Sequence, residues 1–138
     1  MYRKLTFKGG VHPKDNKNFT SSKPIRELEA AHEVVFPLAQ HIGAPCTPCV
    51  SIGDSVRLGT KIADSEAFVS APIHSSVSGI VKAIEKRPVP NGSMVDSIII
   101  ENDFKYTTLP HAEKTKKFHR LSKEEKLSLI RESGVVGL

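Results

Sequence analysis

The fold is decided by residues 53–85, which read GDSVRLGTKIADSEAFVSAPIHSSVSGIVKAIE. Apolar β-branched residues alternate here with small, turn-forming ones, and no apolar spacing of three or four residues continues long enough for a helix. Gly53-Asp54 predicts a tight turn, Gly59 predicts a second, and Ser78-Gly79 predicts a third. We therefore expect short strands joined by close turns in this part of the chain.

Short β-branched segments of the same kind fill residues 34–104. Prolines and glycines separate them, so no segment exceeds about ten residues and helices are excluded here. An open sheet of roughly 70 residues would leave long unpaired edges, which a small flattened barrel avoids. The expected fold class is mainly β, a sandwich or barrel. Strands are expected in VVFPLAQ (34–40), CVSI (49–52), TKIADS (60–65), AFVSAP (67–72), SVSGIVKAIE (76–85) and MVDSIIIEN (94–102).

The flanks differ from this β unit. Residues 1–33 are rich in Gly, Pro, Asn, Ser and Lys, which predicts an extended N-terminal arm. Residues 105–121 are expected to form a polar linker, and residues 122–138 a helical segment.

The helix itself has start and stop signals. Ser122 and Glu125 stand at the spacing of a capping box, and Gly134 stands where a helix usually ends. We predict a helix from about Lys123 to Ser133.

The composition favours a soluble protein of the cytoplasm. Hydrophobic residues make up 38% of the chain and Trp is absent, so the core must be aliphatic. No apolar run reaches the roughly 20 residues that span a bilayer, and the N-terminus lacks the apolar region of a signal peptide. The net charge of +5 lies in the flanks and forms no compact basic stripe. We expect neither a nucleic-acid partner nor direct membrane insertion.

The two cysteines, Cys46 and Cys49, form a C-x-x-C pair. Such a pair suits half of a zinc site or a redox couple, so a small metal-binding redox module is one alternative function. A second pair is missing, and a position before an expected strand lacks the helix N-terminus that lowers the pKa of a redox thiol. We favour a structural role in a Pro-rich turn, without a metal.

No two histidines have the spacing of metal ligands on one helix or strand. For His41 and His74 we expect a ring nitrogen to bond a turn carbonyl or a serine hydroxyl. The serines near His74 lie in an expected hairpin and not in the strand-to-helix turn of a hydrolase nucleophile, so no catalytic residue is expected. The six histidines are His12, His32, His41, His74, His111 and His119.

The succession of turns and strands in residues 53–85 resembles the biotinyl/lipoyl-type barrel-sandwich hybrid domain. Carriers of that type present a lysine at a hairpin tip, where its amine is acylated by the cofactor. The corresponding stretch here is EAFVS (66–70), and Lys61 and Lys82 lie on expected strands. A biotin- or lipoyl-type carrier, modified at an unexpected lysine, is a second alternative function. The residues expected to shape the hairpin and turns are Gly53, Asp54, Gly59, Pro72, His74, Ser78 and Gly79.

A wider resemblance covers almost the whole chain. Several blocks, in the correct order, are similar to the N-terminal domain of RnfC, the C subunit of the Rnf electron-transport complex. The blocks are FKGGVHP (7–13), PLAQHIGAP (37–45), GDSVRLGTKIA (53–63), FVSAPIHSSVSGIVKAIEKRPVPNG (68–92) and SIIIEND (97–103). The ending IRESGVVGL (130–138) resembles the lead-in to the Gly-rich loop of the next domain in that family. We interpret the chain as an N-terminal fragment.

This resemblance implies a parent subunit that helps to transfer electrons between NADH and ferredoxin and couples the transfer to ion translocation across a membrane. The FMN, NADH and [4Fe-4S] sites of the family would lie after residue 138, beginning with a flavin/NADH-binding domain. The fragment would hold no cofactor and would serve as a structural docking domain on the cytoplasmic face of the inner membrane. Its partners would be other subunits of the complex and the downstream domains of its own chain.

Overall fold

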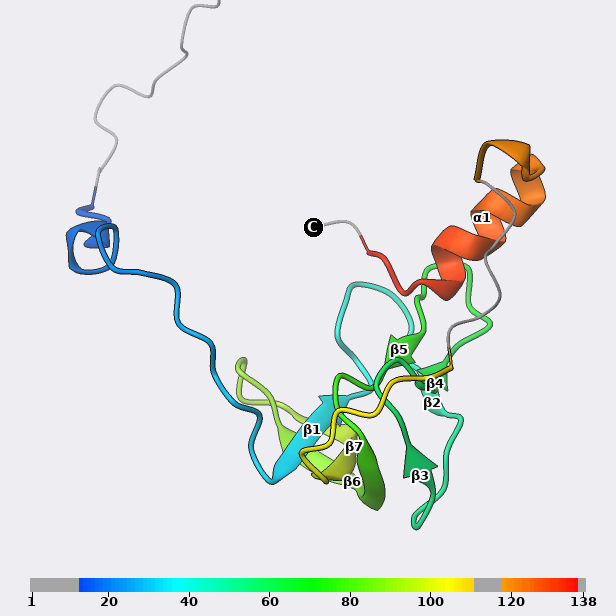
Figure 1. Cartoon of the computed structure of the whole chain (residues 1–138), viewed down its shortest axis with the longest axis horizontal. Coiled ribbons are helices and arrows are strands. Elements are labelled where there is room, and N and C mark those ends of the chain that lie inside the picture. The colour runs from blue at the N-terminus through cyan, green and yellow to red at the C-terminus, as the bar shows by residue number, and fades with distance from the viewer. Residues whose placement is uncertain (1–12, 111–117, 137–138) are drawn as a thin grey trace, which may run out of the picture.

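The computed structural model describes residues 13–110 and 118–136, and within these ranges the fold is mainly β, as expected (Figure 1). A four-stranded antiparallel sheet has the order β1-β7-β6-β3, and a three-stranded antiparallel sheet has the order β2-β4-β5. The strands are β1 (Glu33–Pro37), β2 (Thr47–Pro48), β3 (Ser55–Val56), β4 (Lys61–Asp64), β5 (Ile73–His74), β6 (Gly79–Pro88) and β7 (Met94–Asn102).

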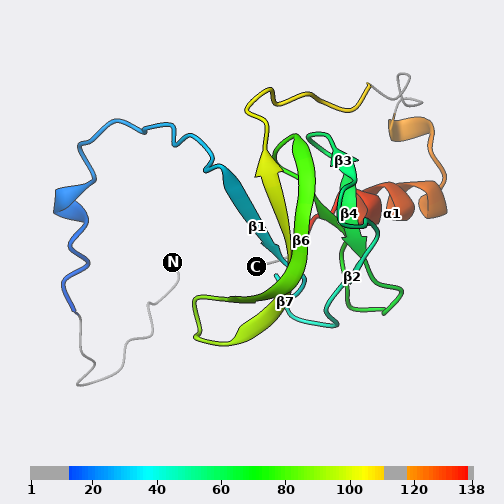
Figure 2. The same cartoon turned by 90° about the horizontal axis from the view of Figure 1, so that it is seen from below.

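The two sheets enclose one core, which is mainly aliphatic, as the composition predicts. Figure 2 shows the curved β6–β7 hairpin of the first sheet on one side and β2 and β4 of the second sheet on the other. Apolar side chains from both sheets meet between them, so that burial of aliphatic surface holds the sheets together. The cluster comprises Phe36, Leu38, Cys46, Val56, Ile62, Ala63, Ile73, Val77, Val81, Ile98 and Ile100.

Strand β7 is the most deeply buried element. Ile98, Ile99 and Ile100 are all fully buried. Because successive side chains on a strand point to opposite faces, both faces of β7 are covered at these residues. Its two edges pair with β1 and β6.

Two expected strands are not strands. Residues 67–72 belong to a loop that joins β4 to β5, in which the Ser70 hydroxyl bonds the carbonyls of Ser65 and Ala67 and closes the chain on itself. Residues 49–52 lead into a turn, because the Ser51 amide bonds the Asp54 carboxylate and not a neighbouring strand. Local side-chain bonds of this kind compete with strand pairing.

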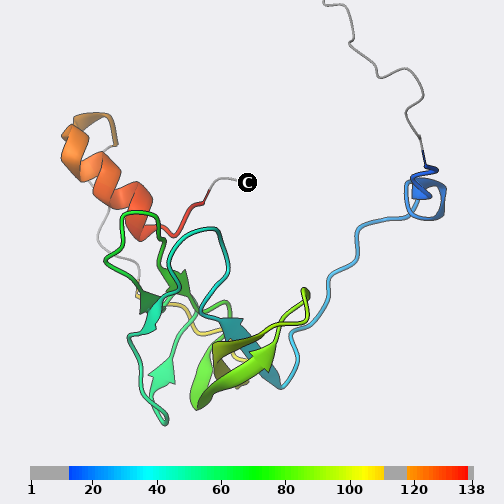
Figure 3. The same cartoon turned by 180° about the vertical axis from the view of Figure 1, so that it is seen from behind.

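The C-terminal helix α1 (Lys123–Glu132) confirms the sequence signals for its ends. The Ser122 hydroxyl accepts the Glu125 amide at 3.1 Å, and the Glu125 carboxylate accepts the Ser122 amide at 2.8 Å. Gly134 has a φ of +67°, a left-handed conformation that ends the helix. Figure 3 shows that α1 ends beside the β4–β5 loop.

The N-terminal arm runs away from the barrel as an extended segment (Figure 1). It contains the single turn η1 (Lys17–Phe19), and a second short turn, η2 (Phe118–Arg120), precedes α1. Ile25 and Leu28 of the arm are exposed. Among the described residues, no helix is both long enough and apolar enough to cross a membrane.

Candidate functional site

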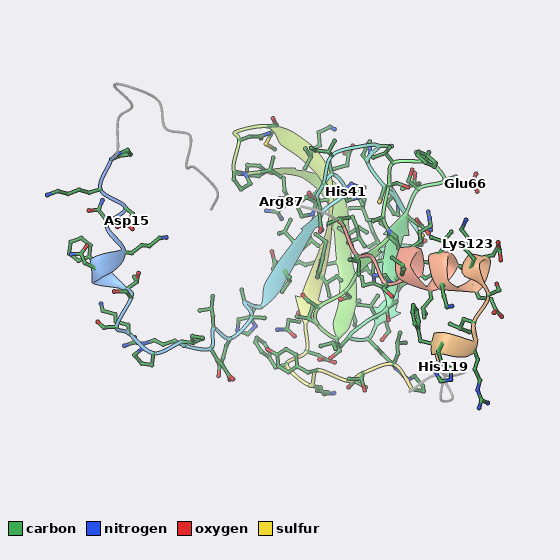
Figure 4. The ribbon with its side chains drawn as sticks, turned by 90° about the horizontal axis from the view of Figure 1, so that it is seen from above. Asp15, His41, Glu66, Arg87, His119 and Lys123 are labelled. Atoms are coloured by element: carbon green, nitrogen blue, oxygen red, sulfur yellow. The ribbon has the colours of Figure 1, made fainter. Side chains whose placement is uncertain are left out.

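The loop between β4 and β5 contains the stretch that, by its resemblance to carrier domains, corresponds to their lysine-bearing hairpin tip. Here the loop carries Phe68, whose side chain is fully exposed, and Val69, whose side chain is half exposed. Figure 4 shows Glu66 of this loop on the same side of the molecule as the start of α1 at Lys123, and Arg87 of β6 on the opposite side. The loop therefore projects an apolar surface and no amine.

A second loop, residues 39–44, is fixed against the first through His41. Nε2 of His41 accepts the Ala71 amide at 3.2 Å, so Nδ1 carries the proton and donates to the Ile42 carbonyl at 3.0 Å. The Ala44 amide donates to the Val69 carbonyl at 3.1 Å. His41 thus bonds a turn carbonyl, as expected, and ties two loops together.

The approach of these loops requires glycine at position 43. Gly43 has a φ of +123°, and a Cβ placed there would lie 2.2 Å from the Val69 carbonyl oxygen. No side chain fits at that distance, so the close contact between the loops depends on glycine.

An ion cluster, formed by Lys61, Asp64, Arg131 and Glu132, attaches α1 to β4. Arg131 donates from Nη2 to Asp64 Oδ1 at 2.9 Å and from the same nitrogen to the Ser65 carbonyl at 2.6 Å. Lys61 Nζ lies 3.1 Å from Asp64 Oδ2 and 2.8 Å from Glu132 Oε2.

These contacts shift the acid–base behaviour of the cluster. The hydrogen bond from Arg131 is the largest cause that holds the pKa of Asp64 far below its usual range. The hydrogen bond from Lys61 lowers the pKa of Glu132, and the bond to Glu132 raises the pKa of Lys61. Sequence reasoning missed this cluster, because charges 67 residues apart leave no local signal.

Pro72 and His74 lie next to Gly134, the residue at which α1 ends. A Cβ on Gly134 would lie 2.7 Å from the Pro72 carbonyl oxygen and 3.2 Å from His74 Nδ1. Within the described ranges the His74 ring has no hydrogen-bond partner, whereas the sequence predicted a bond to a carbonyl or hydroxyl. His74 instead pairs through its backbone with Lys61 in the β4–β5 ladder.

Gly53, Asp54 and Gly59 lie in two tight turns away from the β4–β5 loop. The Gly53 amide bonds the Val81 carbonyl at 2.8 Å, and the Asp54 carboxylate accepts the Ser51 amide at 2.7 Å. The Gly59 amide bonds the Ser75 carbonyl at 2.8 Å. Both glycines have a positive φ, which suits turns.

Ser78 and Gly79 join the start of β6 to the segment after β7. The Ser78 hydroxyl donates to Asp103 at 2.6 Å and accepts the Thr107 amide at 2.9 Å, and the bond from Ser78 lowers the pKa of Asp103. A Cβ on Gly79 would lie 1.9 Å from the Glu101 carbonyl oxygen, so only glycine allows the strands to approach this closely.

The two cysteines flank β2, so the expected position before a strand is wrong for Cys49. Cys46 is buried, donates its thiol to the Ala71 carbonyl at 3.2 Å, and has its pKa raised chiefly by burial. Cys49 is exposed. In the described ranges no three His, Cys, Asp or Glu side chains gather as metal ligands do. His12 and His111 lie outside those ranges.

Lys61 and Lys82, the candidate acceptor amines for a carrier, lie on β4 and β6 as expected. Both are ion-paired: Lys61 with Asp64 and Glu132, and Lys82 with Glu33. The hydrogen bond to Glu33 is the largest cause that raises the pKa of Lys82. A protonated, paired amine is a poor nucleophile.

Comparison with known proteins identifies this architecture. Residues 5–105 match the family model of the RnfC barrel sandwich hybrid domain. The chain is 43% identical over 133 residues to the C subunit of the proton-translocating ferredoxin:NAD(+) oxidoreductase complex of Clostridium ljungdahlii, covering 96% of this chain and 29% of that protein. It is 39% identical to the C subunit of the Na(+)-translocating ferredoxin:NAD(+) oxidoreductase complex of Acetobacterium woodii, covering 96% of this chain and 30% of that protein.

A third relative matches the same share of this chain at a lower identity. The C subunit of the ion-translocating oxidoreductase complex of Vibrio cholerae is 34% identical over 139 residues, which cover 96% of this chain and 17% of that protein. The chain thus spans less than a third of the length of these three relatives. The chain belongs to the RnfC family, and its strands form the barrel sandwich hybrid domain found at the N-terminus of these proteins.

Proposed function

We propose that this chain is the structural docking domain of an RnfC-type subunit in an ion-translocating ferredoxin:NAD oxidoreductase complex. The observation that carries the proposal is the β4–β5 loop, which presents Phe68 and Val69 where a carrier domain presents an amine. An apolar projection contributes contact area and geometry, and neither Phe68 nor Val69 has an amine that could be acylated.

The redox groups of such a subunit belong to its other parts in this proposal. A [4Fe-4S] cluster takes four thiolates, whereas this chain has two cysteines, one of them buried with its thiol bonded to a backbone carbonyl. These residues do not fit a cluster. FMN, NADH and [4Fe-4S] are accordingly proposed for the remainder of the parent subunit, and the domain itself is proposed to be non-catalytic.

The same proposal places the domain on the cytoplasmic face of the inner membrane, among the other subunits of the complex. It is held there by protein contacts and not by insertion into the bilayer.

Deletion of the domain from a subunit-length protein tests the proposal. A chain that lacks the counterpart of residues 1–110 should fail to assemble with the other subunits on native gels, while the soluble subunit should still oxidise NADH with an artificial acceptor. Substitution of exposed Ile52 by Ser, in a turn far from the β4–β5 loop, is the control and should leave assembly intact. Loss of flavin with assembly preserved would contradict the proposal.

A further inference from the structure

Three segments that are distant in sequence bring apolar side chains to one end of the barrel. They are the loop 39–44, the β4–β5 loop, and the residues that follow α1. We call their exposed apolar side chains the apolar rim. Its members are Ile42, which is 93% exposed, the fully exposed Phe68, and the partly exposed Val69, Val135 and Val136.

The apolar rim surrounds a hollow. Its volume is about 620 Å³, and Gln40, His41, Ser70 and Ala71 complete its lining. Loop tips are usually polar, and an apolar patch gathered around a hollow is typical of an interface. These features favour a contact surface over an accident of loop composition.

The framework under the rim is fixed before any partner binds. His41 joins the two loops, Gly43 allows their close approach, and Arg131 holds the end of α1 to Asp64. His41 and Ser70 use their polar groups for hydrogen bonds within these loops, while Ile42, Phe68 and Val69 are exposed. A preordered surface loses little conformational entropy on docking, which favours tight packing.

The position of Val135 and Val136 identifies the occupant. The polypeptide passes through the rim as it leaves α1, and the matching region is the N-terminal domain of relatives that are more than three times as long. A segment tethered directly to the rim meets it at a high effective concentration, which a separate protein would not have. Val135 and Val136 of the rim also belong to the stretch of chain that leaves α1.

We propose that the apolar rim is the seat on which the remainder of an RnfC-type subunit packs, so that this domain and the part that follows it form one fixed unit. This inference rests on the proposed docking function and assigns the docking surface and its occupant.

Amide hydrogen exchange followed by mass spectrometry tests the inference. The 138-residue chain is compared with a subunit-length chain in which residues 1–138 replace the matching region of the Clostridium ljungdahlii protein. Exchange in residues 66–70 and 40–44 should slow at least about tenfold in the longer chain. Exchange at the β6–β7 turn, residues 89–92, should stay unchanged.

Matched variants locate the contact. Phe68→Ser in the longer chain should restore fast exchange in residues 40–44, which lie on the other loop. Ile52→Ser, an equally drastic change of an exposed side chain in a distant turn, should not. Because both side chains are exposed, neither change should unfold the barrel.

Three other outcomes would overturn the inference. Protection that arises only after the other subunits are added would assign the rim to another subunit, and protection that grows with the concentration of the 138-residue chain would assign it to a second copy. Unchanged exchange in every sample would leave the rim without an occupant. The docking function fails separately, if assembly survives deletion of the domain.

Discussion

Arg131 donates two hydrogen bonds to the carboxylate of Asp64, which lies 67 residues earlier in the chain. Nη2 is 2.9 Å from Oδ1, and Nη1 is 3.3 Å from Oδ2. This forked pair joins the last helix to an inner strand of the three-stranded sheet. Lys61 and Glu132 complete the ion cluster around it. The direction in which the chain leaves the barrel is therefore set by charge pairing and not by burial, because α1 has no buried residue.

Removal of the carboxylate at position 64 should loosen α1 while the barrel stays folded. We expect Asp64→Ala to reduce the free energy of unfolding by about 1 kcal/mol, since the pair is partly solvated, and to speed amide exchange throughout α1. Urea unfolding and hydrogen exchange measure the two effects. Asp96→Ala removes a more exposed partner of Lys86 and should change neither. Unaltered exchange in α1 of the Asp64 variant would show that something other than the ion cluster holds the helix.

The same cluster predicts how stability depends on pH. The folded-state pKa of Asp64 lies far below the ordinary value of 3.8, chiefly because of Arg131, and the pKa of Glu132 is lowered by Lys61. These two carboxylates therefore take up protons when the chain unfolds. The stability that they contribute is complete above about pH 5 and is lost as the pH falls through 4 and below. The urea midpoint should drop over this range. Asp64→Asn should flatten the drop, and an unchanged acid profile in that variant would contradict the role of Asp64.

Substitution of Gly43 should separate the loop 39–44 from the β4–β5 loop. An alanine Cβ at a φ of +123° would lie 2.2 Å from the Val69 carbonyl oxygen, so backbone strain and a clash coincide. We expect Gly43→Ala to cost about 2 kcal/mol or more in the free energy of unfolding. Gly92→Ala is the matched control, because Gly92 has a φ of +84° but nothing within 4 Å of the added carbon, and it should cost about 1 kcal/mol. Equal costs for the two variants would mean that the contact between the loops contributes nothing to the free energy of unfolding.

Local patterns were enough to predict much of the fold. Alternating apolar residues placed β1, β4, β6 and β7, and the Ser122–Glu125 pair placed the start of α1. The prediction of strand in residues 67–72 was wrong because exposed apolar side chains on a loop give the same sequence pattern as strand residues that face a core. Phe68 and Val69 look like strand residues for that reason.

The candidate site was less predictable, since its contacts join distant parts of the chain. Nothing near Asp64 indicates Arg131, and nothing near His41 indicates the Ala71 amide. The absence of lysine from the β4–β5 loop was visible in the sequence, whereas the apolar rim needed Val135 and Val136 to be placed beside that loop.

A test for covalent modification distinguishes a docking domain from a carrier domain most clearly. We expect the intact mass of the chain to stay unchanged when it is produced together with biotin and lipoyl ligases, because Lys61 and Lys82 are ion-paired on strands and Val69 occupies the loop. Val69→Lys, alone and with Phe68→Met, places an exposed amine on the loop and shows whether the ligases can reach it. A biotinyl or lipoyl mass on the unaltered chain would overturn the docking function. An adduct found only on the variants would show that the loop keeps an accessible geometry and lacks just the reactive atom.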